Sequence, residues 1–166
     1  MTRLYTHSFS TPAGTLHAAV DRSGAVVRLS WADISGDFDP DEVEVNKYAC
    51  GELEYQLDQY FRGERKTFSV PVSLSGTEFQ ITVWNRLRKI NFGETITYGA
   101  LARKVGRANA AQAVGNAVAI NPIVLIVPCH RVIPSSNGIG NYARRNLPED
   151  RGRSIKQTLL ELEGAL

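Results

Sequence analysis

The sequence contains no long apolar run. The longest one, Ile123–Val127, has the length of a β-strand, whereas a membrane-spanning helix needs about 20 apolar residues. The amino-terminal residues MTRLYTHSFS also lack a hydrophobic targeting segment. We therefore expect no membrane association and a cytoplasmic location.

Cysteine and histidine are scarce as well. With two cysteines, Cys50 and Cys129, and three histidines, neither a disulfide framework nor a structural zinc site is expected. Metal ligands are not clustered, so the sequence predicts no metal and no organic cofactor. We interpret Cys50 as a core thiol on the first long helix.

Charge is unevenly distributed along the chain. Residues 1–76 carry 7 Lys and Arg against 11 Asp and Glu, a net charge of −4, whereas residues 77–166 carry 12 against 6, a net charge of +6. The basic second half is compatible with a polyanionic partner and equally with solvated helix faces.

The first half of the chain has mainly the pattern of β-strands. Residues 1–30 alternate apolar and polar side chains around a turn at Asp21–Gly24, which predicts a hairpin. The acidic residues 33–44 predict a loop, and a one-faced apolar stripe over residues 49–61 predicts a helix that ends near Gly63.

The second half has the periodicity of helices. An amphipathic helix is predicted over residues 77–87, and apolar residues recur at helical spacing over residues 98–105 and 110–118. Gly106 separates the last two, as in a helix-turn-helix motif, although many helical hairpins bind nothing.

The outer face of the second of these two helices carries small residues. Ala111, Gly115 and Ala119 lie one turn apart, with Gln112 and Asn116 beside them. A glycine inside a helix costs about 1 kcal/mol relative to alanine, so a large neighbour is expected to come close there. That neighbour is either another helix or a nucleic-acid groove.

The pentapeptide Pro-Cys-His-Arg-Val at residues 128–132 follows the run Ile123–Val127, which we interpret as a buried strand. A buried structural cysteine is the commoner role for this residue type. A reactive cysteine needs a basic neighbour that helps to form the thiolate. Adjacent strand residues point to opposite faces, so His130 reaches Cys129 only if the chain turns or a water bridges them.

This pentapeptide in its context resembles the O6-alkylguanine-DNA alkyltransferases, which are suicide repair proteins. The resemblance covers most of residues 77–166, whereas residues 1–75 match only in general style, as a variable strand-rich domain. Besides the pentapeptide it rests on Phe79…Val83-Trp84, Gly93-Glu94-Thr95…Tyr98, Leu101-Ala102, Ala113-Val114-Gly115, Asn121-Pro122, Gly140-Asn141-Tyr142 and Lys156…Glu163-Gly164.

The resemblance implies direct reversal of DNA damage. The alkyl group of O6-alkylguanine, with O4-alkylthymine as a second candidate substrate, would pass irreversibly to Cys129. His130 would take the thiol proton through a water, and Glu163 would hold and polarise His130. Tyr98 would donate a proton toward guanine N3, and Asn121 would join the helix-turn-helix to the active segment.

The resemblance also implies a substrate pocket and a DNA-binding surface. The pocket residues would be Phe79, Trp84, Val132, Tyr142 and Ala143. The helix near residues 110–119 would lie in the minor groove of double-stranded DNA while the target base is flipped out. The DNA-binding residues would be Gln112, Ala111, Gly115, Asn116, Ala119, Arg107, Arg131, Arg144 and Arg145. A monomer is expected, with cooperative binding along DNA left open.

The sequence departs from the family pattern at two places. Gln112 stands where the family usually has an arginine that enters the base stack. The link between Tyr142 and Lys156 is several residues longer than usual and carries four arginines. We expect residues 144–153 to form a loop whose arginines contact DNA phosphates.

The last helix is predicted to open at a capping box, Ser154-x-x-Gln157. Its apolar stripe would consist of Ile155, Leu159, Leu162 and Leu166. Glu163 would lie at the edge of that stripe, half-buried. Without the resemblance, Glu163 reads as a solvated glutamate.

These observations predict an α+β fold with a sheet-plus-helix domain over residues 1–75. A mostly helical DNA-binding and alkyl-transfer domain, with a helix-turn-helix and the active cysteine, would span residues 76–166. The alternative function is an alkyltransferase-like module that senses lesions without transfer. The presence of Cys129 argues against it. A cysteine hydrolase with turnover is disfavoured because no independent oxyanion-hole motif is found.

Overall fold

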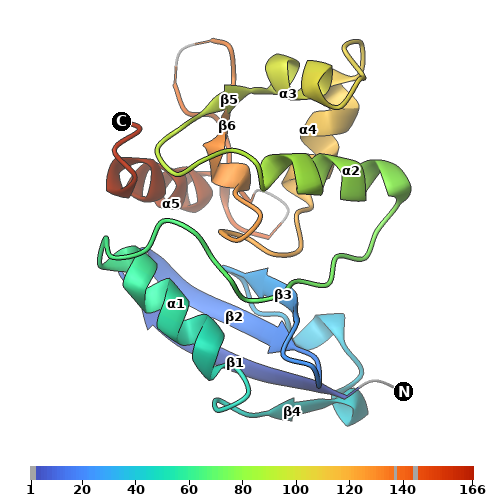
Figure 1. The fold of residues 1–166 in the computed structure, drawn as a ribbon, viewed down its shortest axis with the longest axis vertical. Helices are drawn as coiled ribbons and strands as arrows, with labels where there is room; N and C mark the ends of the chain where they lie inside the picture. Colours follow the sequence, from blue (N-terminus) through green and yellow to red (C-terminus); the bar gives the residue numbers. More distant parts are fainter. Residues whose placement is uncertain (1–2, 137, 144–145) are drawn as a thin grey trace. The chain divides into compact units, whose positions relative to one another are not determined.

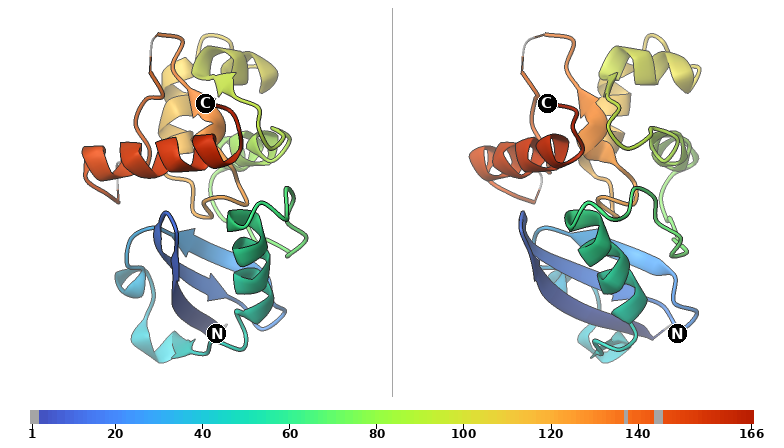
Figure 2. Two further views of the ribbon diagram at one scale, coloured as in Figure 1. Left: turned by 90° about the vertical axis from the view of Figure 1, so that its left-hand side faces the viewer. Right: turned by 60° about the vertical axis from the view of Figure 1, so that its left-hand side comes forward.

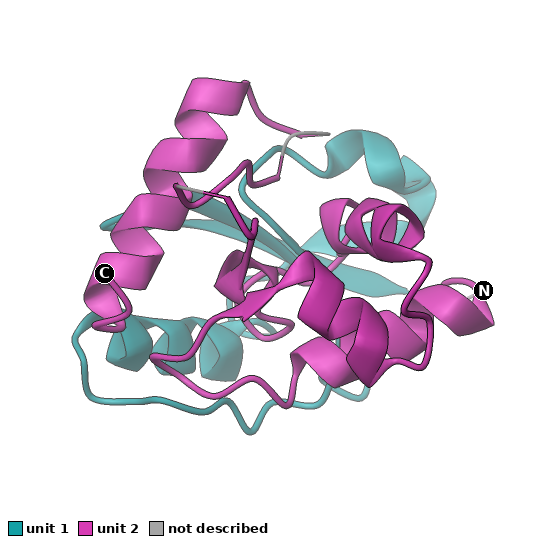
Figure 3. Ribbon diagram, turned by 90° about the horizontal axis from the view of Figure 1, so that it is seen from above, with its two compact units in different colours: residues 1–74 teal, residues 75–166 magenta. Residues whose placement is uncertain are grey.

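A computed structural model of the protein describes residues 3–136, 138–143 and 146–166 (Figure 1). The chain divides into two compact units, Met1–Leu74 and Ser75–Leu166, coloured separately in Figure 3. The first unit holds a sheet and a helix, and the second is mostly helical with a helix-turn-helix, so the predicted α+β class is confirmed. No helix among the described residues is long and apolar enough to span a membrane.

The first unit is a four-stranded sheet with one α-helix. The strand order is β3-β2-β1-β4, in which β1 is antiparallel to β2 and parallel to β4. The strands and the helix are β1 (Leu4–Thr11), β2 (Gly14–Val20), β3 (Val26–Ser30), β4 (Val43–Val45) and α1 (Gly51–Phe61). Figure 2 shows α1 running alongside the sheet.

The predicted hairpin turn at Asp21–Gly24 is confirmed. Gly24 has a φ of +85° and its amide donates to the Asp21 carbonyl oxygen at 3.0 Å. The acidic segment differs from the expected loop because it contains two short 3-10 turns, Ser35–Asp37 and Pro40–Glu42, followed by β4. A three-residue strand at a sheet edge is too short to show an alternating pattern in sequence.

The second unit begins with α2 (Glu78–Leu87), whose first turn is closed by a capping box between Thr77 and Gln80. The helix-turn-helix consists of α3 (Tyr98–Lys104) and α4 (Ala111–Ala119). Gly106, at a φ of +74°, ends α3 in a Schellman motif, with bonds from Gly106 to Arg103 and from Arg107 to Ala102. The Trp84 indole donates to the Ala117 carbonyl oxygen at 2.9 Å and fixes α2 against α4.

The active segment follows α4. It contains a 3-10 turn, Cys129–Arg131, and the strand β6 (Val132–Ile133), which pairs in parallel with β5 (Ile96–Thr97). The long helix α5 (Glu149–Leu162) closes the unit.

The prediction of a strand over Ile123–Val127 is wrong. These residues are buried but form a tight turn in which Leu125 has a φ of +71° and Val127 donates to the Ile123 carbonyl oxygen at 3.1 Å. An apolar run reports burial, and burial alone does not select a strand.

Candidate active site

The described part of the second unit contains a pocket of about 370 Å³ that includes Cys129. Four segments contribute to it: the start of α3, the outer face of α4, the turn at Cys129, and the chain around Pro134 and Gly140–Ala143. Its lining residues are Tyr98, Ala111, Gln112, Gly115, Asn116, Val118, Ala119, Cys129, Pro134, Gly140, Asn141, Tyr142 and Ala143.

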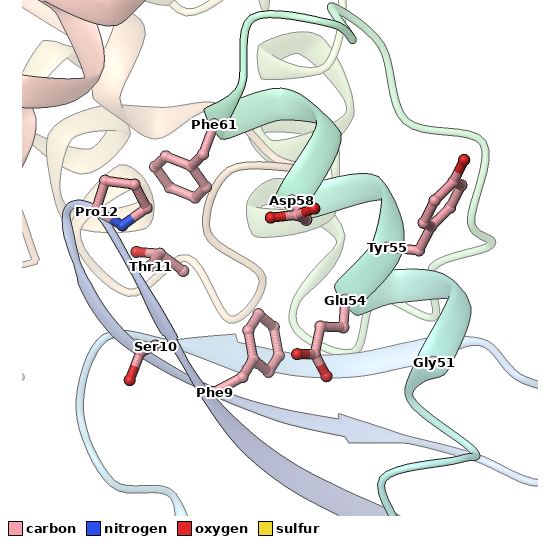
Figure 4. A pocket seen from close by; sticks show the side chains of 9 residues that line it. All are labelled: Phe9, Ser10, Thr11, Pro12, Gly51, Glu54, Tyr55, Asp58 and Phe61. Carbon is pink, nitrogen blue, oxygen red and sulfur yellow. The ribbon is translucent and has the colours of Figure 1, made fainter.

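A larger hollow of about 440 Å³ lies in the first unit, between β1 and α1 (Figure 4). Its two carboxylates are already paired, Glu54 with His7 at 2.8 Å and Asp58 with Arg62 at 3.1 Å. Its lining holds no cysteine or histidine. The smaller pocket, which contains Cys129, is therefore the candidate active site.

Cys129 lies on the 3-10 turn with 6 % of its surface exposed. The Asn121 amide donates to Cys129 Sγ at 3.0 Å and to the Val127 carbonyl oxygen at 2.7 Å, and it accepts from the Ile123 amide at 2.9 Å. Burial raises the pKa of the Cys129 thiol, and the Asn121 hydrogen bond, the Lys156 charge and a Tyr142 hydrogen bond oppose that rise. The resting thiol is neutral, and its deprotonation needs a base.

His130 follows directly and is fully buried. Its Nε2 lies 2.7 Å from Glu163 Oε2. Because a carboxylate only accepts, Nε2 carries the proton and Nδ1 of the neutral ring is the free acceptor. Within the described residues, Nδ1 is the buried side-chain nitrogen or oxygen that lacks a hydrogen-bond partner. Burial lowers the pKa of His130 and the Glu163 carboxylate opposes the fall, so the ring is neutral at rest.

Glu163 is more buried than expected. It caps the C-terminal end of α5 and is 5 % exposed. Besides His130, its carboxylate accepts from Arg131 Nε at 2.9 Å, from Arg131 Nη2 at 3.0 Å and from the Gly93 amide at 3.2 Å. The reading of Glu163 as a solvated glutamate is therefore wrong.

Lys156 belongs to the site, although the sequence analysis gave it no role. Its ammonium group is fully buried and donates to the carbonyl oxygens of Val132 at 2.7 Å and Asn141 at 3.2 Å. Burial lowers its pKa to about 8, against the opposing effect of Cys129. Lysine is almost never buried without partners, and the Val132 partner of Lys156 is distant in the chain, so the sequence offered no local signal for this residue.

The chain from Gly140 to Ala143 forms one wall of the pocket and is held by α5. Arg153 Nη2 donates to Asn141 Oδ1 at 3.0 Å and to Glu149 at 2.9 Å. A Cβ atom on Gly152 would overlap the Tyr142 carbonyl oxygen, so the helix and the wall are in direct backbone contact.

The outer face of α4 lines the pocket. Tyr98 packs on it, because a Cβ on Gly115 would lie 3.7 Å from the Tyr98 ring. Gln112, Ala111 and Asn116 are exposed, which leaves this face open on the side of the pocket.

Several predicted site residues lie elsewhere. Phe79, Trp84 and Val132 do not line the pocket: Trp84 and Val132 are buried in the core, and the Arg107 guanidinium lies 5.8 Å from the centre of the Phe79 ring. Assigning Arg131 to DNA contact is wrong, because it is 5 % exposed and bonded to Glu163. Arg107 is exposed, and Arg144 and Arg145 fall outside the described residues.

The predicted start of the last helix is also wrong. Ser154 lies inside α5, which begins at Glu149 after Pro148 and has acidic residues in its first turn. The predicted loop over residues 144–153 is therefore helical from Glu149 onward, and Leu166 is 62 % exposed rather than in the core.

Together these elements define a helix-turn-helix protein with a buried cysteine that is followed by a histidine paired with a glutamate. Residues 78–165 match the DNA-binding domain of 6-O-methylguanine DNA methyltransferase, and residues 4–74 match the ribonuclease-like domain of the same family. The chain belongs to this 6-O-methylguanine DNA methyltransferase family, as the resemblance implied.

Relatives and solved structures agree. The chain is 40 % identical over 162 residues to a methylated-DNA–protein-cysteine methyltransferase of Methanosarcina acetivorans, covering 98 % of this chain and 99 % of the relative. It is 42 % identical to the Mycobacterium leprae protein of that name, covering 87 % and 76 %. Mycobacterium tuberculosis OGT in complex with DNA is similar with a TM-score of 0.84 and 35 % identity, covering 97 % and 93 %.

Proposed function

We propose that this chain repairs O6-alkylguanine in double-stranded DNA by direct reversal, with Cys129 as the alkyl acceptor. The observation that carries the proposal is the buried Cys129 thiol in a pocket beside α4, followed in the chain by His130, whose Nε2 is hydrogen-bonded to Glu163. The family and the relatives' names supply the reaction class. The second unit would both bind DNA and transfer the alkyl group.

The reaction moves one alkyl group and two protons, one from the Cys129 thiol and one from the Tyr98 hydroxyl. Cys129 sulfur forms a bond to the alkyl carbon as the bond from that carbon to guanine O6 breaks. The thiol proton passes through a water to His130 Nδ1, and Glu163 stabilises the imidazolium that forms. A proton from Tyr98 at guanine N3 offsets the charge on the leaving base. The thioether has no route back, so each protein acts once.

Pocket groups near Cys129 would orient the base. The carbonyl oxygen of Cys129 would accept from the guanine amino group, and the Ala143 amide would face O6. The Val132 carbonyl oxygen, for which the same role was expected, accepts from Lys156 instead, and Val132 does not line the pocket. Tyr142 would form a wall of the pocket.

DNA binding is assigned to α4. Its small exposed face would approach the minor groove closely while the lesion is flipped into the pocket, with Gln112 next to the vacated stack and Arg107 near a phosphate. We assign this role to a monomer.

A stoichiometry experiment tests the proposal. The protein is mixed with a duplex that carries one O6-methylguanine with a labelled methyl group. We expect label on Cys129 up to one equivalent, none in Cys129→Ser, and full transfer in the matched variant Cys50→Ser, since Cys50 is buried in the other unit. Binding without transfer would indicate a lesion sensor, and release over many turnovers would indicate a hydrolase.

A further inference from the structure

Arg131 is buried directly against the proton-transfer pair. Its guanidinium donates to both oxygens of Glu163, through Nε at 2.9 Å and Nη2 at 3.0 Å. Nη1 donates to the Ile90 carbonyl oxygen at 2.6 Å. The side chain is 6 % exposed and that of Glu163 is not exposed at all, so water scarcely screens the pair.

This geometry fixes the charge on Glu163. A guanidinium stays protonated in proteins. Two of its N–H groups can donate parallel hydrogen bonds to the two oxygens of one carboxylate. With His130 and the Gly93 amide, Glu163 accepts four hydrogen bonds, about as many as a carboxylate has lone-pair sites. Glu163 is therefore held ionised, in one orientation, with acceptor sites for His130 and no donor of its own.

Several charges act on His130 from the elements around it. Burial is the largest cause of the lowered pKa of His130; Glu163 at the end of α5 raises this pKa, whereas Arg131 on the same turn and Lys156 from α5 lower it further. A lone carboxylate would favour a permanent imidazolium, which has no acceptor nitrogen. The Arg131 charge opposes that of Glu163 and acts together with burial to keep the ring neutral, with a free Nδ1.

We propose that Arg131 is a positioning residue for alkyl transfer: by clamping Glu163 from both oxygens, it holds His130 as the neutral tautomer protonated on Nε2. This role rests on the proposed function, in which His130 Nδ1 receives the proton of Cys129. It does not involve DNA contact, because the guanidinium is committed to Glu163 and to the Ile90 carbonyl oxygen.

The direct test reads His130 in the unreacted protein. Nitrogen-15 NMR of wild type is recorded between pH 5 and 8, with His130→Gln used to assign the signals apart from those of His7 and His17. We expect the neutral ring protonated on Nε2 at pH 7. A neutral ring protonated on Nδ1, or an imidazolium at pH 7, would overturn the proposal.

Two variants separate the effect of the Arg131 charge from the effect of its paired hydrogen bonds to Glu163. Arg131→Gln removes the positive charge, so the His130 titration midpoint should rise by about one pH unit or more. The rate of Cys129 alkylation by free O6-benzylguanine should fall at low pH, and the midpoint of that fall should rise by the same amount as the His130 midpoint. Arg131→Lys keeps the charge and loses the paired hydrogen bonds, so the midpoint should stay while the plateau rate falls about tenfold.

The matched control is Arg88→Gln, an exposed arginine near Ile90. A midpoint shift in Arg131→Gln no larger than in Arg88→Gln would reduce Arg131 to a purely structural role and overturn the proposal. If Arg131→Gln does not fold, the wild-type tautomer and Arg131→Lys decide the question. The spectra need no DNA, so a failure of transfer from DNA with the expected tautomer contradicts the proposed function and not this inference.

Discussion

Gln112 lies exposed on α4 and lines the pocket that contains Cys129. The family usually has an arginine here. A flipped base leaves a gap in the stack and an unpaired cytosine, at an unstacking cost of a few kcal/mol. The glutamine amide still donates and accepts, but it is shorter than arginine and uncharged, so we expect flipping to be weaker in this chain.

Gln112→Arg should therefore speed repair of a methylated duplex and tighten DNA binding, because arginine also suits the negative potential of the minor groove. The reaction with free O6-benzylguanine should stay nearly unchanged, since a free base needs no flipping. Single-turnover rates with both substrates measure the difference. An equal change in the rates with both substrates would indicate that residue 112 acts on the reaction in the pocket and does not enter the base stack.

At the scale of elements, α5 connects the two ends of the site. Its first turns contact the pocket wall through Gly152, Arg153 and Lys156, and its last residue holds His130 through Glu163. The position of this helix therefore affects both the wall of the pocket and the orientation of the His130 ring.

Gly152→Ala tests the contact with the wall. In a free helix the change would stabilise by about 1 kcal/mol, but here the new methyl group overlaps the Tyr142 carbonyl oxygen and pushes the wall into the pocket. We expect lower thermal stability and a rate with free O6-benzylguanine that falls about tenfold more than the rate with O6-methylguanine, a difference of about 1.4 kcal/mol. The control Ser154→Ala, at an exposed position of the same helix, should change neither the thermal stability nor the ratio of the two rates. An equal loss of rate with both substrates would show that the pocket has not become narrower.

Elements that could be predicted had local causes. The caps at Thr77 and Gly106 and the stripes of α1 to α4 are set by neighbouring residues, and they confirm the expected helices. The turn at Leu125 could not be predicted, because its left-handed backbone is imposed by surrounding contacts. Pro148 and the acidic residues after it are a sequence signal for the start of α5. The prediction instead followed the apparent capping box at Ser154 and therefore placed the start too late.

In the site, too, only features with a local sequence signature could be predicted. The sequence pointed to Cys129, His130 and Glu163 through their resemblance to a family. The burial of Arg131 and Lys156 could not be predicted, because it depends on partners more than 20 residues away in the chain: Glu163 for Arg131 and the Val132 carbonyl oxygen for Lys156. Long-range ion pairs and carbonyl contacts leave no periodic trace in sequence.

At the scale of the whole molecule, one buried histidine links stability to pH. The pKa of folded His130 lies below its ordinary value of 6.5, chiefly because of burial. As the pH falls below 6.5, the unfolded chain binds a proton that the folded chain does not. The free energy of unfolding must then decrease with falling pH, by at most about 1.4 kcal/mol per unit from this residue.

Comparison with His130→Gln isolates this effect. In a Trp31→Phe background, Trp84 fluorescence reports denaturant unfolding of the second unit. Above pH 7 the difference in unfolding free energy between the protein with His130 and the His130→Gln variant should be constant. Below pH 6.5 that difference should move steadily in favour of the variant. Parallel curves down to pH 5 would show that His130 is not held neutral.

The contact of α5 with the wall also bears on how alkyl preference can be altered. Among the residues that the structure describes, those lining the pocket include none from α5. A directed-evolution library restricted to substrate-contacting positions would thus leave Gly152, Arg153 and Lys156 untouched. We expect selectivity in this chain to change also with substitutions at these α5 residues, which lie behind the wall and do not line the pocket.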